Sequence, residues 1–488
     1  MSHLDVPRFP RGFVLSDRHV EPPPTFVPGP LLDHFWVHPW TNVEVAGNHE
    51  LLVIILGHCI PTVPGHSEDP AKELLRALRR GVDVFLDSLS TYSGRHAVIF
   101  GEPGNLAVVN DATGMRSVFY AIGSSVVASH ALLVEQALGG TIERSQLPFR
   151  YGYPGNRTPY ARTRILTPNT YYWMTAGVVR RFWPLLEPTP QTVDEAAAAL
   201  LEASTTALQM MSRNKRIEVT LTAGLDSRTI LAVAMHAGVP FRTYTYGNKY
   251  STKVDRLIAE HLAYIHQLEH TVISERYDVP LVEKSLDVSH YSLHHPAWVG
   301  PLMRYFESQE DVAVLGNALE IGRSNYGPQR KNNVPPPLTA KTMAELHHRK
   351  LGEPAFKEIE QYGETRFWEE AEAAFQGFIE DTGYNLVVGL LDPFDQFYWE
   401  HRMPTWQGVA MGERDFYGVP FIPYNSRRVF ATMLGTPSES RHEDAVALRM
   451  IEMVDPKLLD FPVNPKTWSR AKAVHWGLLP TEATVTAD

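Results

Sequence analysis

The sequence predicts an α/β protein of two domains, and three observations support that fold class. Between residues 96 and 121, strand patterns follow one another with only short turns between them, as in sheets joined by hairpins. From residue 216 onward, strand and helix patterns alternate, which favours a parallel sheet with helices on both faces. The chain has 488 residues, of which 44% are hydrophobic, so it is long enough for two or three packed domains.

Apolar runs and turn residues mark the elements of the N-terminal half. Residues 1–30 are rich in proline and predict an extended arm that lies over the surface. The continuous apolar run at residues 51–57 predicts a buried strand, and residues 70–89 predict an amphipathic helix. Three further strands are predicted at residues 96–100, 106–111 and 117–121.

The boundary between the two halves is predicted just before a capping box. Thr192 and Glu195 have the spacing at which a threonine hydroxyl and a glutamate carboxylate cap the first turn of a helix. An alanine-rich helical pattern follows at residues 196–211. We therefore place the two domains at residues 1–188 and 189–488.

The stretch RIEVTLTAGLDSR, residues 216–228, carries the strongest functional signal. Alternating apolar residues up to Leu221 predict a strand, and an apolar helical pattern follows as far as Gly238. A strand that ends in a turn of small residues and begins a helix directs backbone N–H groups at one point, which favours a phosphate site. The residues assigned to this site are Leu221, Thr222, Gly224, Leu225, Asp226 and Ser227.

Strand and helix patterns continue to alternate after this stretch. Strands are predicted at residues 241–247, 270–273 and 312–316, and a helix at residues 254–265. Ligands of such sheets bind at the carboxyl ends of the strands. We therefore expect Tyr246, near the end of the second strand, to lie close to the phosphate chain.

Composition argues against several classes of protein. The net charge of −10 is unlike that of nucleic-acid binders, which cluster Lys and Arg against phosphates. The single cysteine, Cys59, excludes an intramolecular disulfide framework, which fits a reducing compartment. No apolar run approaches the roughly 20 residues that span a bilayer, and residues 1–11 lack the apolar region of a signal peptide. We expect a cytoplasmic protein that binds neither nucleic acid nor membrane.

The loop at residues 222–227 resembles the SGGxDS loop of the PP-loop pyrophosphatases. Thr222 stands in place of serine and Ala223 in place of the first glycine, so both positions stay small. The resemblance implies an enzyme that splits ATP into AMP and pyrophosphate, with Asp226 holding Mg²⁺ against the phosphates. It is not a Walker A loop, because no Gly-Lys-Ser/Thr follows a glycine at the required spacing.

Residues 94–100 and 106–120 are similar to the G-x-F-A … D-x-x-G-x-R-P-L-Y-Y signature of class II glutamine amidotransferase domains, as in asparagine synthetases. The resemblance implies an N-terminal sandwich domain of the Ntn-hydrolase type. Those domains use an N-terminal cysteine as nucleophile, whereas Ser2 follows Met1 here and Cys59 lies after a buried strand. We therefore expect a degenerate domain that serves as a scaffold and does not hydrolyse glutamine.

A second acidic motif follows the predicted strand at residues 312–316. Asparagine synthetases carry G-E-G-x-D-E and β-lactam synthetases carry G-Y-G-x-D at this place. The match at Gly316 implies a contact with the nucleotide, and the match at Glu320 implies a second carboxylate for Mg²⁺ beside Asp226. Asn317 stands where β-lactam synthetases have a tyrosine of the proton-abstracting pair, and asparagine cannot act as a base.

Three residues of the helical C-terminal part are assigned to catalysis from the same resemblance. Glu400 lies about where the family supplies a catalytic glutamate, and Arg441 lies where the family has a lysine that meets phosphate. Residues 470–477 look like the R-P-K-x-x-V-H-x-G stretch of β-lactam synthetases. The resemblance implies that Lys472 stabilises the negative charge that develops during acyl transfer.

The resemblance thus implies an ATP-dependent, AMP-forming amide synthetase. Because Asn317 disfavours β-lactam closure, we expect macrolactam closure of the lasso-peptide type or another natural-product ligation, acting on a small-molecule or peptide substrate. A partner protein that delivers a peptide is a further possibility. The alternatives are a β-lactam synthetase, an ammonia-dependent asparagine synthetase, and a scaffold of the same fold without activity.

Overall fold

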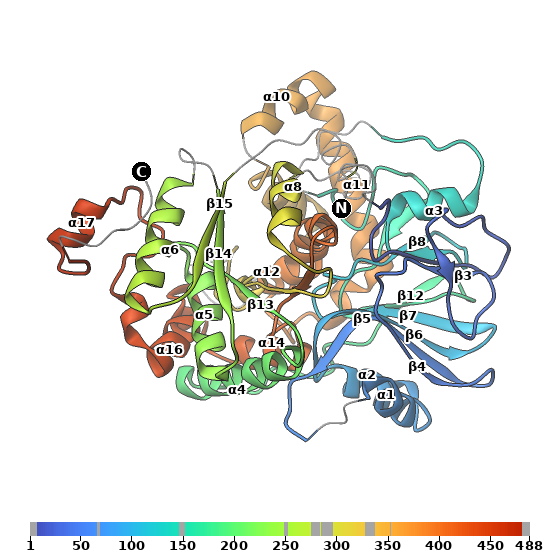
Figure 1. Ribbon diagram of the computed structural model, residues 1–488. Coiled ribbons are helices and arrows are strands. Elements are labelled where there is room, and N and C mark those ends of the chain that lie inside the picture. The colour runs from blue at the N-terminus through green and yellow to red at the C-terminus, as the bar shows by residue number, and fades with distance from the viewer. Residues whose placement is uncertain are drawn as a thin grey trace.

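The computed structural model describes residues 7–65, 69–145, 152–247, 252–274, 284, 296–326, 337–351 and 353–480. Within these residues the chain forms two antiparallel sheets and one parallel sheet, with helices around them (Figure 1). This architecture confirms the predicted α/β class. The division of the chain at residue 188 stays a prediction.

The first antiparallel sheet has the strand order β10-β8-β9-β1-β3-β2. Its strands are β1 (Phe13–Leu15), β2 (Val27–Pro28), β3 (Phe35–Val37), β8 (Phe119–Ala121), β9 (Val127–Ala128) and β10 (Thr163–Ile165). The prediction of a surface arm at residues 1–30 was wrong for residues 7–30, because β1 pairs with both β3 and β9 inside this sheet; residues 1–6 lie outside the described residues. The apolar run of β1 is flanked by prolines, and its burial depends on strands that come later in the chain.

The second antiparallel sheet has the strand order β12-β11-β7-β6-β5-β4. Its strands are β4 (Val43–Gly47), β5 (Leu52–Pro61), β6 (Tyr92–Glu102), β7 (Asn105–Asn110), β11 (Thr170–Trp173) and β12 (Val178–Arg181). On β5, Leu52, Ile54 and Leu56 pack into the core between the two sheets, whereas Val53 and Ile55 pack toward helices on the other face. This alternation with a period of two residues buries the first half of β5, Leu52–Leu56, on both faces.

Helices cover both outer faces of the two sheets. The helices α1 (Pro70–Leu78) and α2 (Val82–Leu89) pack against the second sheet, and α3 (Ala131–Leu138) packs against the first. The prediction of one helix at residues 70–89 was wrong in one respect. Gly81 has a φ of 136° and separates α1 from α2, a conformation that glycine adopts without steric cost.

The parallel sheet has the strand order β15-β14-β13-β16-β17. Its strands are β13 (Ile217–Thr220), β14 (Arg242–Gly247), β15 (His270–Ser274), β16 (Val312–Val314) and β17 (Val419–Phe421), and every neighbouring pair is parallel. Figure 1 shows α6 (Lys253–Ile265) and α8 (Pro296–Tyr305) on opposite sides of β14 and β15. The strand order changes direction at β13, which is where doubly wound sheets bind their ligands.

The two antiparallel sheets pack on each other as a sandwich. The remaining helices surround the parallel sheet and lie between it and this sandwich. They are α4 (Val193–Met211), α5 (Leu225–Ala237), η1 (Leu319–Arg323), α9 (Ala340–His348), α10 (Glu353–Tyr362), α11 (Glu364–Thr382), η2 (Tyr384–Val387), α12 (Pro393–Phe397), η3 (Tyr398–Gly408), α13 (Val409–Arg414), α14 (Arg427–Leu434), α15 (Ser438–His442), α16 (Ala445–Val454), η4 (Pro456–Leu459) and α17 (Arg470–His475). As predicted, Thr192 and Glu195 form a capping box at the start of α4.

Polar contacts tie the sandwich to the C-terminal part. The guanidinium of Arg95 on β6 forms a two-point ion pair with the buried carboxylate of Asp415, which follows α13. Asn425, after β17, donates to the carbonyl of Gly94 at 2.7 Å, and the indole N–H of Trp399 donates to the carbonyl of Ala112 at 2.6 Å.

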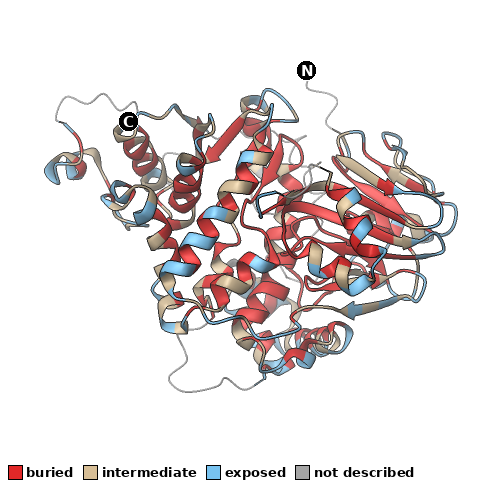
Figure 2. Ribbon diagram, turned by 90° about the horizontal axis from the view of Figure 1, so that it is seen from below, coloured by how far each residue is buried: buried red, intermediate tan, exposed pale blue. Residues whose placement is uncertain are grey.

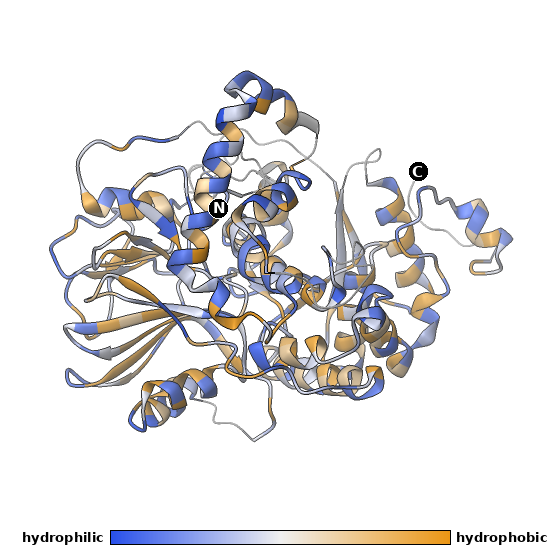
Figure 3. Cartoon of the chain, turned by 180° about the vertical axis from the view of Figure 1, so that it is seen from behind, coloured by the Kyte–Doolittle hydropathy of each residue, from blue (hydrophilic) through white to orange (hydrophobic). Residues whose placement is uncertain are grey.

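Figure 2 shows buried residues along the sheets and on the inner helix faces, and exposed residues on the outer faces. Figure 3 shows many hydrophilic residues on the protruding helices α10 and α11.

Candidate active site

The predicted phosphate loop lies at the carboxyl end of β13, in the middle of the parallel sheet. Residues 221–224 connect β13 to α5, whose N-cap is Gly224. The side chains of Leu221 and Leu225 are buried and anchor the loop in the core, so these two residues contribute backbone groups only. The first N–H groups of a helix have no partner within the helix, so those at the start of α5 point out of the loop.

Two hydroxyl groups close the loop on itself. The Thr222 Oγ1 and Ser227 Oγ atoms lie 2.9 Å apart, and the backbone N–H of Thr222 donates to Ser227 Oγ at 3.1 Å. The N–H of Gly224 donates to Thr222 Oγ1 at 3.1 Å. From outside the loop, Asp255 of α6 accepts the N–H of Ala223 at 3.1 Å. The loop is therefore held in shape before any ligand arrives.

The structure brings Glu320 close to Asp226, as predicted. Glu320 belongs to η1, which follows β16. After burial, the charge of Asp226 has the largest influence on the pKa of Glu320. Burial, and then the negative charge of Asp226, raise the pKa of Glu320 to about 8. Its Oε2 atom is buried and has no hydrogen-bond partner among the residues that the structure describes. Burial also raises the pKa of Asp226.

Arg323 and Asp444 join this pair and were not predicted. The Nη1 atom of Arg323 lies 2.5 Å from Asp226 Oδ1. The same guanidinium forms a two-point ion pair with Asp444, at 2.6 and 3.0 Å. Arg323 lies three residues beyond Glu320, so the acidic motif could have indicated it. Asp444 lies at the start of α16, and no sequence motif indicates that it reaches this site.

Gly316 lies against Asp226 because no side chain separates them. A Cβ atom built on Gly316 would lie 2.4 Å from the backbone oxygen of Asp226 and 2.6 Å from its carbonyl carbon. Such distances are well below van der Waals contact, so only glycine fits at this place. The end of β16 thereby sets the position of the first turn of α5.

We expect Gly316→Ala to lower ATP–pyrophosphate exchange by roughly a hundredfold, because a displacement of about 1 Å in a reactive site has an effect of that size. The exchange rate at saturating ATP is the measurement. The matched control is Gly377→Ala on α11, where a Cβ would meet nothing within 4 Å. Equal exchange rates in the two variants would contradict the positional role of Gly316.

The carboxylates of Asp226 and Glu320 fit the Mg²⁺ that the loop motif implies. The buried Oε2 of Glu320 is an oxygen ligand without a present partner, and carboxylate oxygens are the ligands that Mg²⁺ prefers. Across the described residues, no group of three or more His, Cys, Asp or Glu side chains is arranged to hold a metal by itself. Phosphate oxygens would therefore have to complete the coordination, which is usual for Mg²⁺.

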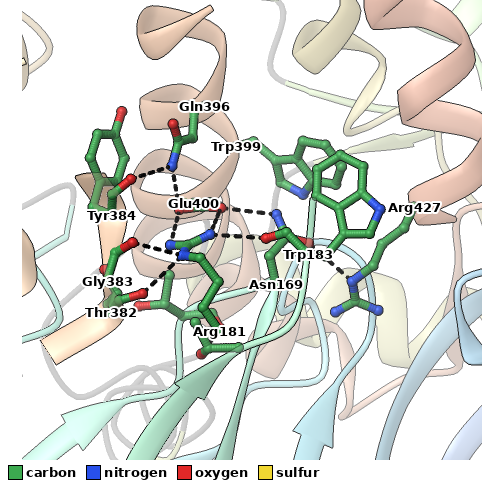
Figure 4. Close-up of polar contacts among 12 residues, drawn as sticks. Asn169, Arg181, Trp183, Thr382, Gly383, Tyr384, Gln396, Trp399, Glu400 and Arg427 are labelled. Atoms are coloured by element: carbon green, nitrogen blue, oxygen red, sulfur yellow. Dashed lines mark hydrogen bonds and ion pairs between the residues drawn. The ribbon is translucent and has the colours of Figure 1, made fainter. Parts of the chain in front are cut away.

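The structure does not bring Glu400 to the loop. Its fully buried carboxylate forms a two-point ion pair with Arg181 of β12, at 2.7 and 2.8 Å, and accepts the side-chain amide of Asn169 at 3.1 Å (Figure 4). Gln396 adds a fourth contact at 3.3 Å. These bonds connect η3 to the sandwich, and they leave the carboxylate engaged by protein groups.

Arg441 is likewise engaged by the protein. Its side chain is buried, and each guanidinium nitrogen donates: Nε to Ser324 at 3.3 Å, Nη1 to the carbonyls of Leu434 and Thr436, and Nη2 to Asp395 at 2.8 Å. Because Ser324 directly follows η1, Arg441 supports the element that carries Glu320 and Arg323.

Lys472 lies on α17, which Figure 1 places at the outer edge of the molecule beyond α6. Its side chain is exposed, and its Nζ atom donates to Thr467 at 2.8 Å. The segment before α17 does reach the loop, because the N–H of Asn464 donates to the carbonyl of Ala223 at 3.1 Å. Lys472 itself is not among the residues gathered around Asp226, and its role in acyl transfer stays a prediction.

Tyr246 lies at the end of β14, as predicted, and borders a cavity of about 260 Å³ beside the loop. The cavity extends to Asn317, which directly follows Gly316. The side-chain amide of Asn317 donates to the side-chain oxygen of Gln407 at 3.1 Å. The strand end of β14, the strand end of β16 and the phosphate loop thus share one edge of the sheet.

Comparison with known proteins adds structural likenesses of low similarity. No family model and no curated protein matches the sequence. Among solved structures, an NMN synthetase from Francisella tularensis is 16% identical with a TM-score of 0.21, and the match covers 28% of this chain and 59% of that one. A glutamine-dependent NAD+ synthetase from Acinetobacter baumannii, in complex with ADP, is 13% identical with a TM-score of 0.19, and the match covers 36% of each chain.

A glutamine phosphoribosylpyrophosphate amidotransferase from B. subtilis, complexed with ADP and GMP, is 12% identical with a TM-score of 0.19, and the match covers 58% of this chain and 59% of that one. The chain therefore spans less than two thirds of the length of each of these proteins. Identities and TM-scores of this size are too low to transfer an activity, so the function is inferred from the geometry of the site.

Proposed function

We propose that this chain is an ATP-dependent, AMP-forming amide synthetase. The observation that carries the proposal is the loop at the carboxyl end of β13, where the Thr222 and Ser227 hydroxyls meet at the start of α5 and Asp226, in the first turn of α5, lies close to Glu320. A phosphate chain at a helix N-terminus next to two acids suits adenylation, in which the charge of pyrophosphate must be neutralised as it leaves.

The residues would divide the reaction between them. The Thr222 and Ser227 hydroxyls and the first N–H groups of α5 would bind phosphate oxygens while a substrate carboxylate attacks the α-phosphorus and pyrophosphate leaves. Asp226 and Glu320 would hold Mg²⁺, which supplies positive charge to the departing pyrophosphate. An amine would then displace AMP from the acyl-adenylate to form the amide.

ATP–pyrophosphate exchange tests this proposal. The exchange is measured with Mg²⁺ across a panel of carboxylates that includes amino acids, β-amino acids and short peptides. Exchange that depends on one class of acid, and that stops when EDTA removes the metal, supports adenylation. Absence of exchange together with absence of an ATP-induced thermal shift would favour the inactive scaffold instead.

The same panel separates the finer forms of the proposal. Macrolactam closure of a peptide is the form expected from the sequence, with β-lactam synthesis and ammonia-dependent asparagine synthesis as alternatives. Aspartate with ammonium as sole substrates would identify the last of these, whereas release of AMP with a peptide alone would identify ring closure. A peptide-delivering partner and a cytoplasmic location stay predictions. No described helix is long and apolar enough to cross a membrane.

Lys472 is tested by separating the two half-reactions. We expect Lys472→Ala to leave exchange unchanged and to slow amide formation on the order of a hundredfold, as the loss of one group that stabilises an oxyanion does. The control is Lys466→Ala, another exposed lysine of the same segment. Amide formation at the normal rate in Lys472→Ala would agree with the exposed position of the side chain and would remove it from the mechanism.

A further inference from the structure

The cavity beside the phosphate loop is built from elements on both sides of the strand ends. Its lining includes Tyr246 at the end of β14, Asn317 after β16, Trp298 of α8, Trp406 of η3 and Arg414 at the end of α13. Its volume is about 260 Å³. At roughly 30 Å³ for each water molecule in the liquid, this is the volume of about nine waters, which suits a molecule of amino-acid size.

Arg414 faces this cavity without a carboxylate partner. Its Nη1 atom donates to the Tyr417 hydroxyl at 3.2 Å, and its Nη2 atom donates to the Tyr246 hydroxyl at 3.4 Å. Within the described part of the chain, no acidic oxygen lies at ion-pair distance from this guanidinium, unlike those of Arg95, Arg181 and Arg323. A half-buried guanidinium whose hydrogen bonds to the described residues go to two phenols can still take a carboxylate in two-point fashion.

Arg414 is not the only charged group near the cavity. Asn317 lies next to Gly316, which packs directly on Asp226, so this part of the lining is close to Asp226 and Asp444, with Arg323 as their cation. An ammonium group is attracted to such surroundings and a second carboxylate is repelled. Glu413 also lines the cavity; its side chain is buried and has interactions of its own, and it is the one carboxylate among the lining residues.

The walls of the cavity select for an apolar body. Trp298, Leu302 and Met411 line it, and the aromatic ring of Tyr246 packs against Trp298 with ring centroids 5.3 Å apart. Apolar lining with a few polar groups at fixed places is typical of small-molecule sites. The cavity thus offers one cation and an apolar lining, with the acidic groups around Asp226 close to its Asn317 side.

We propose that this cavity binds the amine substrate, an apolar α-amino acid whose carboxylate is held by Arg414. The inference rests on the proposed function for the reaction that follows. The amine nitrogen forms a bond to the carbonyl carbon of the acyl-adenylate, the bond from that carbon to the AMP oxygen breaks, and AMP leaves with the electron pair. The bound ammonium gives one proton to water before the attack, which frees the electron pair of the nitrogen, and the nitrogen gives a second proton to water once the new bond has formed. Arg414 binds a group that keeps its charge throughout.

Binding without ATP tests the site itself. The full chain is titrated with leucine and phenylalanine and with their carboxamides, and tryptophan fluorescence and calorimetry are recorded, since Trp298 and Trp406 lie in the walls. The free acids should bind roughly ten- to a hundredfold more tightly than the amides, because the amides lack the charge-assisted bonds to Arg414. Equal affinities, or no binding of either acid, would overturn the proposal.

Variants identify the residue responsible. Arg414→Gln should bring the affinity for each acid down to that for its amide, whereas Arg428→Gln, at an exposed arginine of α14, should leave the ratio unchanged. If circular dichroism shows that Arg414→Gln does not fold, Arg414→Lys replaces it. A lysine ammonium cannot form the two-point contact, so the ratio should still fall by roughly tenfold. An unchanged ratio in the folded variant would overturn the proposal.

Kinetics separate this inference from the proposed function. Given a carboxylate that supports pyrophosphate exchange, Arg414→Gln should raise the KM for the amino acid by roughly ten- to a hundredfold and leave exchange unaltered. A loss of ATP affinity instead would mean that the cavity serves the nucleotide, which overturns the inference. Amino-acid binding that depends on Arg414, with no exchange for any acid, would uphold this site and refute the synthetase.

Discussion

Asp226→Asn should lower ATP–pyrophosphate exchange on the order of a thousandfold. The amide cannot supply the negative charge that holds a divalent cation, and such a cation contributes several kcal/mol to the stabilisation of departing phosphate groups. Exchange is measured at saturating ATP and Mg²⁺ with the acid that the panel identifies. The variant should still fold, because Arg323 keeps its two-point ion pair with Asp444.

The control for this variant makes the same chemical change elsewhere. Asp87→Asn alters an exposed carboxylate on α2 that pairs with Arg428 at 3.5 Å. Exchange should be normal in this variant. If Asp226→Asn kept more than a tenth of the normal exchange while its thermal transition was unchanged, Asp226 would not hold the metal, and the two-carboxylate site would be wrong.

Glu400→Ala should destabilise the fold by about 3–5 kcal/mol, the usual cost of leaving one partner of a buried ion pair without the other. The variant leaves the guanidinium of Arg181 without its carboxylate partner, although the Arg181 side chain is only 5% exposed. It also removes the acceptor for the side-chain amide of Asn169. The midpoint of urea unfolding, with the slope of the transition held equal, is the measurement. Pyrophosphate exchange below the transition should be normal.

Two further variants make this result specific. Glu370→Ala removes a glutamate of intermediate exposure that pairs with the exposed Arg366 on α11, and its midpoint should hardly change. Replacing both buried partners, in Glu400→Leu with Arg181→Met, should recover most of the lost stability, because no charge is then left unpaired. A Glu400→Ala protein of normal stability that lost exchange would restore the catalytic role expected from the sequence.

The three catalytic assignments show what a sequence motif alone can predict about the position of a side chain in the fold. Glu400, Arg441 and Lys472 were each placed by their order along the chain relative to a family pattern. The structure shows Glu400 bonded to a residue 219 positions away and Arg441 bonded to one 46 positions away. Such pairings depend on how helices dock on the sandwich, which the order of residues does not report.

The loop shows the opposite case. Thr222, Gly224 and Ser227 contact one another within six consecutive residues, so their geometry follows from local sequence. The same holds for the buried strands β5, β6 and β7 and for the capping box of α4, whose apolar alternation or side-chain spacing is complete within each segment.

The sequence by itself determined the α/β class, the loop of small and hydroxyl residues at a strand end, and the acidic motif after the fourth strand of the parallel sheet. Each of these depends on backbone hydrogen bonds and apolar periodicity over a few residues. Only the tertiary structure decided that β1 lies inside a sheet, that Arg323 connects Asp226 to Asp444, and that Arg414 faces a cavity beside the loop. Those contacts join segments far apart in the chain, and they form only where whole elements pack together.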